Sequence, residues 1–385
     1  MFQTQIHHPY HPTTERTVLL DHKSTTYQPT THPSSLGTEE KRILRKLDRR
    51  ILPLTAILYL SAYLDRGNLG NARLQGLQSE LLDESDTKFS VVLCSFFITY
   101  VILSIPGTLL AKAISPSKTI AIGAIIWASA TSLIASCNSY SGLIFLRMMI
   151  GVGEALFGQS VALYYSVWYK KGEISTRLAM FIGAGVSAGG FGGLIAYAVS
   201  TLGPNNWRML FLVEGIPSLL VACAILFWLP SRPDKSPFLS SGERAVVLHR
   251  LQEDGGYEAT EQGIDWSGVR RALTDWKAYV ISILFSCLNL TLGSVSGFLP
   301  SIVASMGHAG PIAQLYTIPP HIVAFITMTL ISIASDRYQT RALPIAGVFT
   351  ISSIGWIILI LTDHNNSLRY FATFLVVIGG VSCIS

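Results

Sequence analysis

The chain has 385 residues, of which 50% are hydrophobic and only 13% are charged, with a formal net charge of +5. A soluble globular domain carries about 25% charged residues, so this composition excludes an ordinary water-soluble fold. The excess of Lys and Arg comes without any nucleic-acid-binding motif in the sequence, which argues against an RNA or DNA partner.

The first 40 residues are rich in His, Pro, Thr and Ser and contain no apolar core of the kind that a signal peptide needs. This composition predicts a disordered cytoplasmic tail over residues 1–40. The first membrane-spanning helix must then direct the chain to the membrane.

Ten apolar runs of membrane-spanning length follow the tail. Six precede a polar stretch at 231–277 and four follow it, the last being cut off by the end of the chain at Ser385. The sequence therefore predicts an all-α integral membrane protein with about ten spans. The runs are 51–71, 89–111, 119–137, 143–164, 178–202, 209–229, 278–301, 312–335, 342–361 and a last one from Tyr370.

Basic and non-basic loops alternate along the chain. The segment 41–50 holds six Lys and Arg residues, whereas the next connection, around 80–86, is acidic. Because short cytoplasmic loops carry the excess of Lys and Arg, this pattern places the N-terminus and the central stretch in the cytoplasm. Asn365, which begins an Asn-Asn-Ser acceptor sequence, then lies outside and is a candidate for glycosylation.

The polar stretch 231–277 has the features of a cytoplasmic linker with short helices. Ser240 and Glu243 have the spacing of a helix N-terminal capping box. Further on, apolar residues from Trp266 to Trp276 recur at helical spacing beside basic residues, which predicts an amphipathic helix along the membrane surface.

Six spans, a linker and further spans form the plan of a transporter built from two six-helix halves around a substrate site. This plan divides the chain into the tail (1–40), a first half (41–230), the linker (231–277) and an incomplete second half (278–385).

Ionisable residues inside a span are costly, so each is a functional candidate. Arg147 and Glu154 are seven residues apart, two helical turns, and therefore share one face of a helix. Arg147 could hold an anionic substrate and Glu154 a proton; alternatively, both only pair with other helices. Asp65 and Arg66 point about 100° apart, and one of them is expected to pair locally. Asp65 is a second, weaker candidate for the proton.

Polar and aromatic side chains on the spans could complete a pocket. The Pro-Pro pair before His321 interrupts its span and frees backbone carbonyls, which is tolerated where a cavity satisfies them. The Gly-rich run 183–193 lies within a span and indicates close helix packing, not a nucleotide loop. The pocket candidates are Tyr63, Asn68, Tyr197, Asn289, Gln314 and His321.

Several of these stretches together resemble the anion:cation symporter family of the major facilitator superfamily, in particular its fungal branch of allantoate, nicotinate, pantothenate and biotin permeases. The similarity runs from about Lys41 to the end of the chain. The stretches are Leu64 to Ala72, Arg147 to Ala155, Trp207 to Pro217, Phe298 to Ile302, Gln314 to Pro320, and Asp336-Arg337 with Arg341.

The resemblance implies a major facilitator fold and proton-coupled uptake of a small anionic nutrient across the plasma membrane. It implies a monomer. The sequence has no metal-binding cluster, nucleophile–base arrangement or cofactor loop, so we expect neither a cofactor nor an enzyme. Arg208 and Glu214 would then act mainly in contacts between helices. Asp336, Arg337 and Arg341 would form a charged latch that gates the cytoplasmic side.

Three departures from the family pattern leave alternatives open. Ser104 stands where relatives often carry an acidic residue, and Gly158-Gln159-Ser160 replaces a usual Pro-Gly pair. The chain also ends in an apolar run, as though spans eleven and twelve were absent. The alternatives are a truncated non-transporting relative, a nutrient sensor, or an efflux antiporter for a metabolite. The substrate itself does not follow from the sequence.

Overall fold

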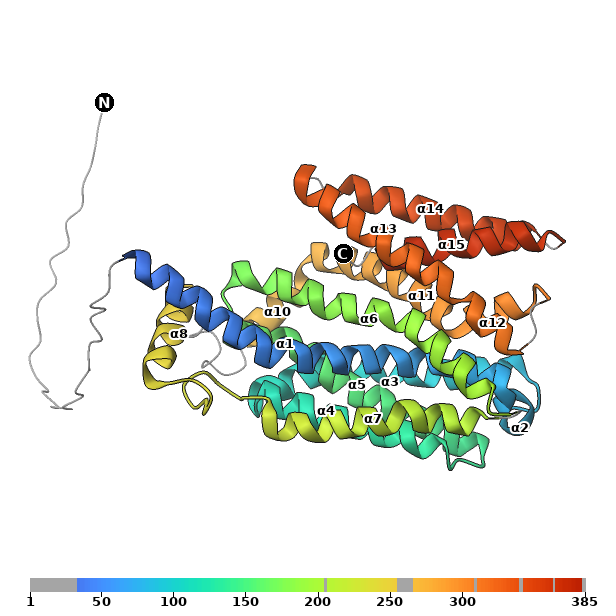
Figure 1. Cartoon of the computed structure of the whole chain (residues 1–385), viewed down its shortest axis with the longest axis horizontal. Coiled ribbons are helices and arrows are strands. Elements are labelled where there is room, and N and C mark those ends of the chain that lie inside the picture. Colours follow the sequence, from blue (N-terminus) through green and yellow to red (C-terminus); the bar gives the residue numbers. More distant parts are fainter. Residues whose placement is uncertain are drawn as a thin grey trace, which may run out of the picture.

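The computed structural model describes residues 33–203, 206–254, 266–307, 310–338, 342–362 and 364–382. Every regular element in these ranges is a helix. Figure 1 shows the long helices lying side by side along one direction, in a first group from α1 to α7 and a second group from α11 to α15. The all-α membrane fold predicted from the sequence is thereby confirmed.

The first group starts with the longest helix of the described chain. It contains α1 (Pro33–Ala72), the short π-helix η1 (Arg73–Leu77), α2 (Gln78–Leu81), α3 (Asp86–Ala113), α4 (Pro116–Ile134), α5 (Tyr140–Trp168), α6 (Lys171–Ser200) and α7 (Trp207–Trp228). Serine side chains cap several N-termini, as Ser85 does for α3 and Ser139 for α5.

Two short helices connect the groups, and the second group follows. These elements are α8 (Ser241–Glu253), α10 (Trp266–Thr274), α11 (Trp276–Ala304), α12 (Gly310–Tyr316), α13 (Ile318–Tyr338), α14 (Ala342–Leu361) and α15 (Asn366–Ser382). Ser240 and Glu243 form the predicted capping box of α8. We call the end of the bundle next to α8 the α8 end, and the opposite end the α2 end (Figure 1).

Eight helical stretches of the described chain are long and apolar enough to cross a membrane. They are α3 to α7, the first part of α11, the stretch Ile312–Ile331, and α14. The apolar part of α1 contains Asp65 and Arg66, and α15 offers a shorter apolar run, Asn366–Val381. The predicted number of ten spans therefore stays a prediction.

Helix α1 begins well before the predicted first span. It starts at Pro33, so residues 33–40 are helical where the sequence predicted a disordered tail; residues 1–32 lie outside the described residues. Ile43, Leu47 and Ile51 recur every four residues and are all buried. This apolar stripe explains why the charged segment continues the helix, since it packs into the core of the first group.

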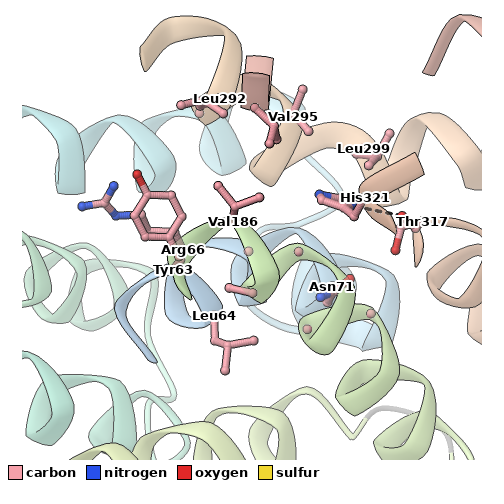
Figure 2. A pocket seen from close by; sticks show the side chains of 18 of the residues that line it. Tyr63, Leu64, Arg66, Asn71, Val186, Leu292, Val295, Leu299, Thr317 and His321 are labelled. Carbon is pink, nitrogen blue, oxygen red and sulfur yellow. Dashed lines mark hydrogen bonds between the residues drawn. The ribbon is translucent and has the colours of Figure 1, made fainter. Parts of the chain in front are cut away.

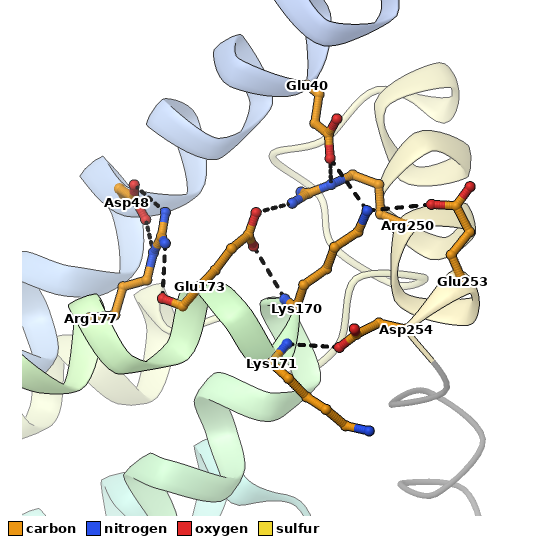
Figure 3. Close-up of polar contacts among 9 residues, drawn as sticks. All are labelled: Glu40, Asp48, Lys170, Lys171, Glu173, Arg177, Arg250, Glu253 and Asp254. Atoms are coloured by element: carbon orange, nitrogen blue, oxygen red, sulfur yellow. Dashed lines mark hydrogen bonds and ion pairs between the residues drawn. The ribbon is translucent and has the colours of Figure 1, made fainter. Parts of the chain in front are cut away.

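Charged side chains fasten α8 to the first group at the α8 end (Figure 3). The side chain of Arg250 is only 6% exposed; it pairs with Glu40 of α1 and donates to Glu173 of α6 at 2.5 Å. The Lys170 ammonium lies 3.3 Å from Glu253 and 3.6 Å from Glu40. These contacts connect the linker helix to two different elements of the first group.

We expect Arg250→Met to loosen α8, because it leaves two carboxylates without their buried cation, at a cost of about 1–3 kcal/mol. Trypsin should then cleave the chain between 228 and 276 several times faster than in the wild type. Lys171→Met is the matched control, since its side chain is exposed and points away from the cluster (Figure 3). Equal cleavage rates in both variants would contradict this role for Arg250.

Glycine brings α4 and α5 into direct backbone contact. A Cβ built on Gly153 would lie 2.5 Å from the carbonyl oxygen of Gly123 and 2.5 Å from the amide nitrogen of Trp127. Both of these are backbone atoms, so relief requires the helices to separate. Small residues at such crossings permit the close packing on which membrane helix association depends.

Gly153→Ala is therefore expected to destabilise the first group by about 2 kcal/mol or more. The measurement is thermal unfolding of the detergent-purified protein, together with its yield at the membrane. Gly190→Ala on α6 serves as the control, because nothing lies within 4 Å of a Cβ there. If the two variants unfold at the same temperature, the close crossing of α4 and α5 is not what holds this part of the bundle.

Candidate substrate site

A cavity lies between the two groups of helices (Figure 2). Its walls come from α1, α3 and α6 on one side and from α11, the α12–α13 junction and α15 on the other. Its volume is ≈ 100 Å³. A water molecule needs only about 10–15 Å³ of such space, so the cavity has room for a small solute.

Arg66 is the one Lys, Arg, Asp or Glu residue among the described residues that line the cavity. Its Nε donates to Oε2 of Glu154 at 2.7 Å, and its Nη2 lies 2.5 Å from the same oxygen. The rings of Tyr63 and Tyr100 flank the guanidinium at 4.8 and 5.2 Å from its centre. Because a guanidinium has five N–H groups, this pairing leaves donors for a ligand.

Glu154 is part of a larger buried cluster of charges behind this wall. Asp65, Arg147, Glu154 and Glu214 are each at most 5% exposed and come from α1, α5 and α7. The charge of Arg147 acts through space on all three carboxylates, since no ion pair joins them to it among the described residues. Asp65 accepts a hydrogen bond from Thr131 at 3.2 Å. With Arg66, the cluster contains three carboxyl groups and two guanidinium groups.

The predicted pocket residues divide between the cavity and its surroundings. Tyr63, Asn289 and His321 line the cavity, whereas Asn68 and Arg147 are buried outside its lining. Tyr197 also lies outside the lining, nearer the α2 end of α6. The roles of these residues in binding stay predictions.

Gln314 lies beside the cavity and connects the two groups of helices. Its Nε2 donates to the carbonyl oxygen of Asn71 at 3.3 Å, and its Oε1 accepts from Gln75 at 3.2 Å. Gln75 also donates to the carbonyl of Ala196 at 2.8 Å. This buried amide bridge holds the groups together toward the α2 end.

Three polar residues of the lining, Arg66, Asn71 and Thr317, were not among the pocket residues predicted from the sequence. It expected Asp65 or Arg66 to pair locally, whereas Arg66 pairs with Glu154, 88 residues along the chain. A usable signal was present, because Tyr63 and Arg66 are three residues apart and lie on one helix face. Tyr63 was a pocket candidate, so its helical neighbour Arg66 could have been assigned to the pocket as well.

Arg208, whose role in helix contacts stays a prediction, lies at the α2 end. Its Nη1 lies 2.6 and 2.7 Å from the two oxygens of Glu80, and its Nη2 donates to Asn138 at 2.9 Å. Trp207 donates to Glu80 through its indole N–H at 2.7 Å. Hydrogen bonds from Trp207 and Arg208 lower the pKa of the Glu80 carboxyl.

The remaining predicted residues are partly beyond the described structure. Asp336 and Arg337 belong to α13, but their side chains lie outside the described residues, as does all of Arg341. The gating latch is therefore still a prediction. Asn365 is exposed just before α15, where its side chain accepts from the amide of Leu368 at 3.2 Å.

Residues 55–385 match the sequence model of the Major Facilitator Superfamily. This chain belongs to that superfamily. The MFS transporter prlL of the fungal strain NRRL 50135 is 32% identical over 375 residues, which cover 94% of this chain and 76% of that protein. The high-affinity nicotinic acid transporter of Saccharomyces cerevisiae is 30% identical over 349 residues, covering 90% of this chain and 65% of that one.

Solved structures of the superfamily have the same fold. The proton:xylose symporter XylE bound to 6-bromo-6-deoxy-D-glucose superposes with a TM-score of 0.67 at 14% identity, over 87% of this chain and 81% of that chain. At this identity the likeness concerns the fold alone. The family and the fold together make the chain a multi-pass secondary transporter and not an enzyme.

Proposed function

We propose that this major facilitator protein carries a small carboxylate together with a proton, and that Arg66 binds the carboxylate. The observation that carries the proposal is the position of Arg66, as the one Lys, Arg, Asp or Glu residue among the described residues lining the cavity between the groups. A guanidinium binds a carboxylate through parallel N–H···O bonds, and this pairing gains strength away from water.

Glu154 is the proton site in this proposal. A substrate carboxylate that binds Arg66 competes with Glu154 for the same guanidinium. Glu154 is 1% exposed, and a buried carboxylate that loses its cation is costly. Uptake of one proton by Glu154 removes this cost, so anion and proton would bind together. Arg147 acts behind the cavity wall, where its charge balances Asp65 and Glu214.

The direction of transport follows from the orientation predicted by the loops. The α8 end carries the basic segment 41–50 and would face the cytoplasm, with the α2 end outside the plasma membrane. An inward proton gradient would then drive uptake.

Uptake of labelled nicotinate, allantoate, pantothenate, biotin and short peptides by cells expressing the chain tests the function. We expect saturable uptake of at least one carboxylate, which collapses when the proton gradient is removed. Absence of uptake with the protein present at the membrane would overturn the proposal in favour of a non-transporting relative or a sensor. Gradient-driven loss of a labelled compound from preloaded cells would instead identify an efflux antiporter.

A further inference from the structure

Two side chains on the second-group wall of the cavity have already used their hydrogen-bond donors. Thr317 donates its hydroxyl proton to the carbonyl of Gln314 at 2.7 Å. The Nδ1 atom of His321 lies 2.9 Å from the carbonyl oxygen of Thr317. Figure 2 shows both side chains on the wall opposite Tyr63 and Arg66.

The contact with Thr317 fixes the tautomer of His321. A carbonyl oxygen only accepts hydrogen bonds, so Nδ1 must carry the proton. In the neutral ring Nε2 is then an acceptor. The ring lies directly against Gly189, where an added Cβ would be 2.2 Å from Nε2. Since Gly189 and His321 both line the cavity, this lone pair is available to a ligand there.

Asn289 adds a third hydrogen-bond acceptor on the same side. Its Nδ2 donates to the carbonyl of Phe285 at 2.8 Å, one turn earlier in α11. Its Oδ1 makes no hydrogen bond among the described residues. Three residues of α11 and the α12–α13 region thus direct a donor back to their own helix and leave acceptors.

The opposite wall, formed by the first group of helices, presents hydrogen-bond donors. Arg66 offers N–H groups beyond those that bind Glu154. Tyr63 accepts a hydrogen bond from Tyr59 at 3.2 Å, so its own hydroxyl proton is free to be donated. One wall therefore presents a cation and donors, whereas the other presents three acceptors and a single remaining N–H, that of Asn289.

From this polarity we infer that the cavity selects carboxylates that carry N–H or O–H groups at their other end, with the carboxylate at Arg66 and the donor groups at His321 and Thr317. The inference rests on the proposed function and narrows its substrate class. Amide, ureido and hydroxy acids have such donors. A pyridine carboxylate has only a second acceptor, which would face the lone pairs of His321 and Thr317.

The strength of the selection follows from the burial of the acceptors. Thr317 is 3% exposed, so it has little water to bond when the ligand lacks a donor. A site built to hydrogen-bond a ligand group discriminates strongly against an analogue without that group. We expect about a tenfold preference or more for the donor-bearing compound.

Binding of N-acetyl-β-alanine and of its N-methyl analogue to the purified full chain tests the inference. The two differ in a single amide N–H, and the Kd of each is measured by calorimetry in detergent. We expect the N–H compound to bind at least about tenfold more tightly. Pantothenate should likewise bind more tightly than nicotinate. Equal affinities within each pair would overturn the inference while leaving the anion site at Arg66 intact.

Variants of Thr317 separate selection from folding. Thr317→Val keeps the shape and removes the acceptor, so the preference should fall to about twofold. Thr317→Ser keeps the acceptor and should retain the preference. A preference that persists in Thr317→Val would show that Thr317 does not select the ligand. If neither compound binds the wild type at any concentration, the proposed function itself fails.

Discussion

Replacing Arg66 by Gln is expected to reduce carboxylate uptake at least 100-fold in kcat/KM. The variant loses the one Lys or Arg side chain that the described cavity wall offers to an anion. Truncating one partner of a buried, hydrogen-bonded charge pair costs about 2–5 kcal/mol, and 2.7 kcal/mol corresponds to 100-fold. Arg66→Lys keeps the charge but loses the two-point contact, so we expect an intermediate loss of about tenfold.

Arg147→Gln is the matched comparison for this experiment. Arg147 is as deeply buried as Glu154 and does not line the cavity, so its loss leaves Asp65 and Glu214 without their cation. We expect Arg147→Gln to lower the thermal stability and the amount of protein at the membrane, whereas Arg66→Gln remains folded because Glu154 takes up a proton.

Two measurements distinguish these variants: initial uptake rate per molecule at the cell surface, and unfolding temperature in detergent. The assignment of the substrate site to Arg66 would be wrong under two conditions. Arg66→Gln would have to take up substrate normally, and Arg147→Gln would have to lose uptake while remaining stably folded. The substrate would then bind at Arg147, as the sequence alone predicted.

The fold could be predicted from the sequence because a helix that spans the membrane must be apolar along its length. The apolar run 89–111 corresponds to α3 (Asp86–Ala113), and 342–361 corresponds to α14 (Ala342–Leu361). The hydrocarbon core sets the length of each run, whatever the neighbouring helices are. The start of α1 at Pro33 was not predicted because Ile43 and Leu47 stand among many charged residues. The mean hydropathy of this segment therefore stays below that of a membrane span.

The site was harder to predict because spacing along one helix does not fix how that helix is rotated in the bundle. Arg147 and Glu154 are both buried, as their two-turn separation suggested, but their face points into the first group and not into the cavity. The side chain that reaches the cavity, Arg66, comes from another helix and pairs with Glu154. Such a contact depends on tertiary packing, which a single sequence does not specify.

The second large effect is expected from Glu154→Gln, which should abolish proton-driven accumulation while leaving exchange of the carboxylate intact. In the proposed mechanism, binding of the anion is linked to uptake of a proton by Glu154, so affinity should improve as pH falls. Glutamine is neutral at every pH and can still accept a hydrogen bond from Arg66. The variant should therefore bind the anion with little dependence on pH and move it only down its own gradient.

Proteoliposomes allow both activities to be measured on one preparation. Counterflow of labelled substrate reports binding and movement across the membrane, whereas net accumulation under an imposed proton gradient reports coupling. Glu84→Gln is the control, since Glu84 is an exposed acidic residue in the connection before α3. We expect Glu84→Gln to perform both activities, and Glu154→Gln to perform counterflow alone.

Accumulation by Glu154→Gln would place the proton on another carboxyl group of the buried cluster. In the Glu154→Gln variant, the buried cluster keeps two carboxyl groups, those of Asp65 and Glu214. It also keeps the guanidinium groups of Arg66 and Arg147. Asp65 already accepts from Thr131. Both oxygens of Glu214 are buried without a hydrogen-bond partner among the described residues, so Glu214 would be the next group to test. Loss of accumulation in Glu154→Gln, with counterflow retained, confines the coupling to the one carboxylate that shares Arg66 with the substrate.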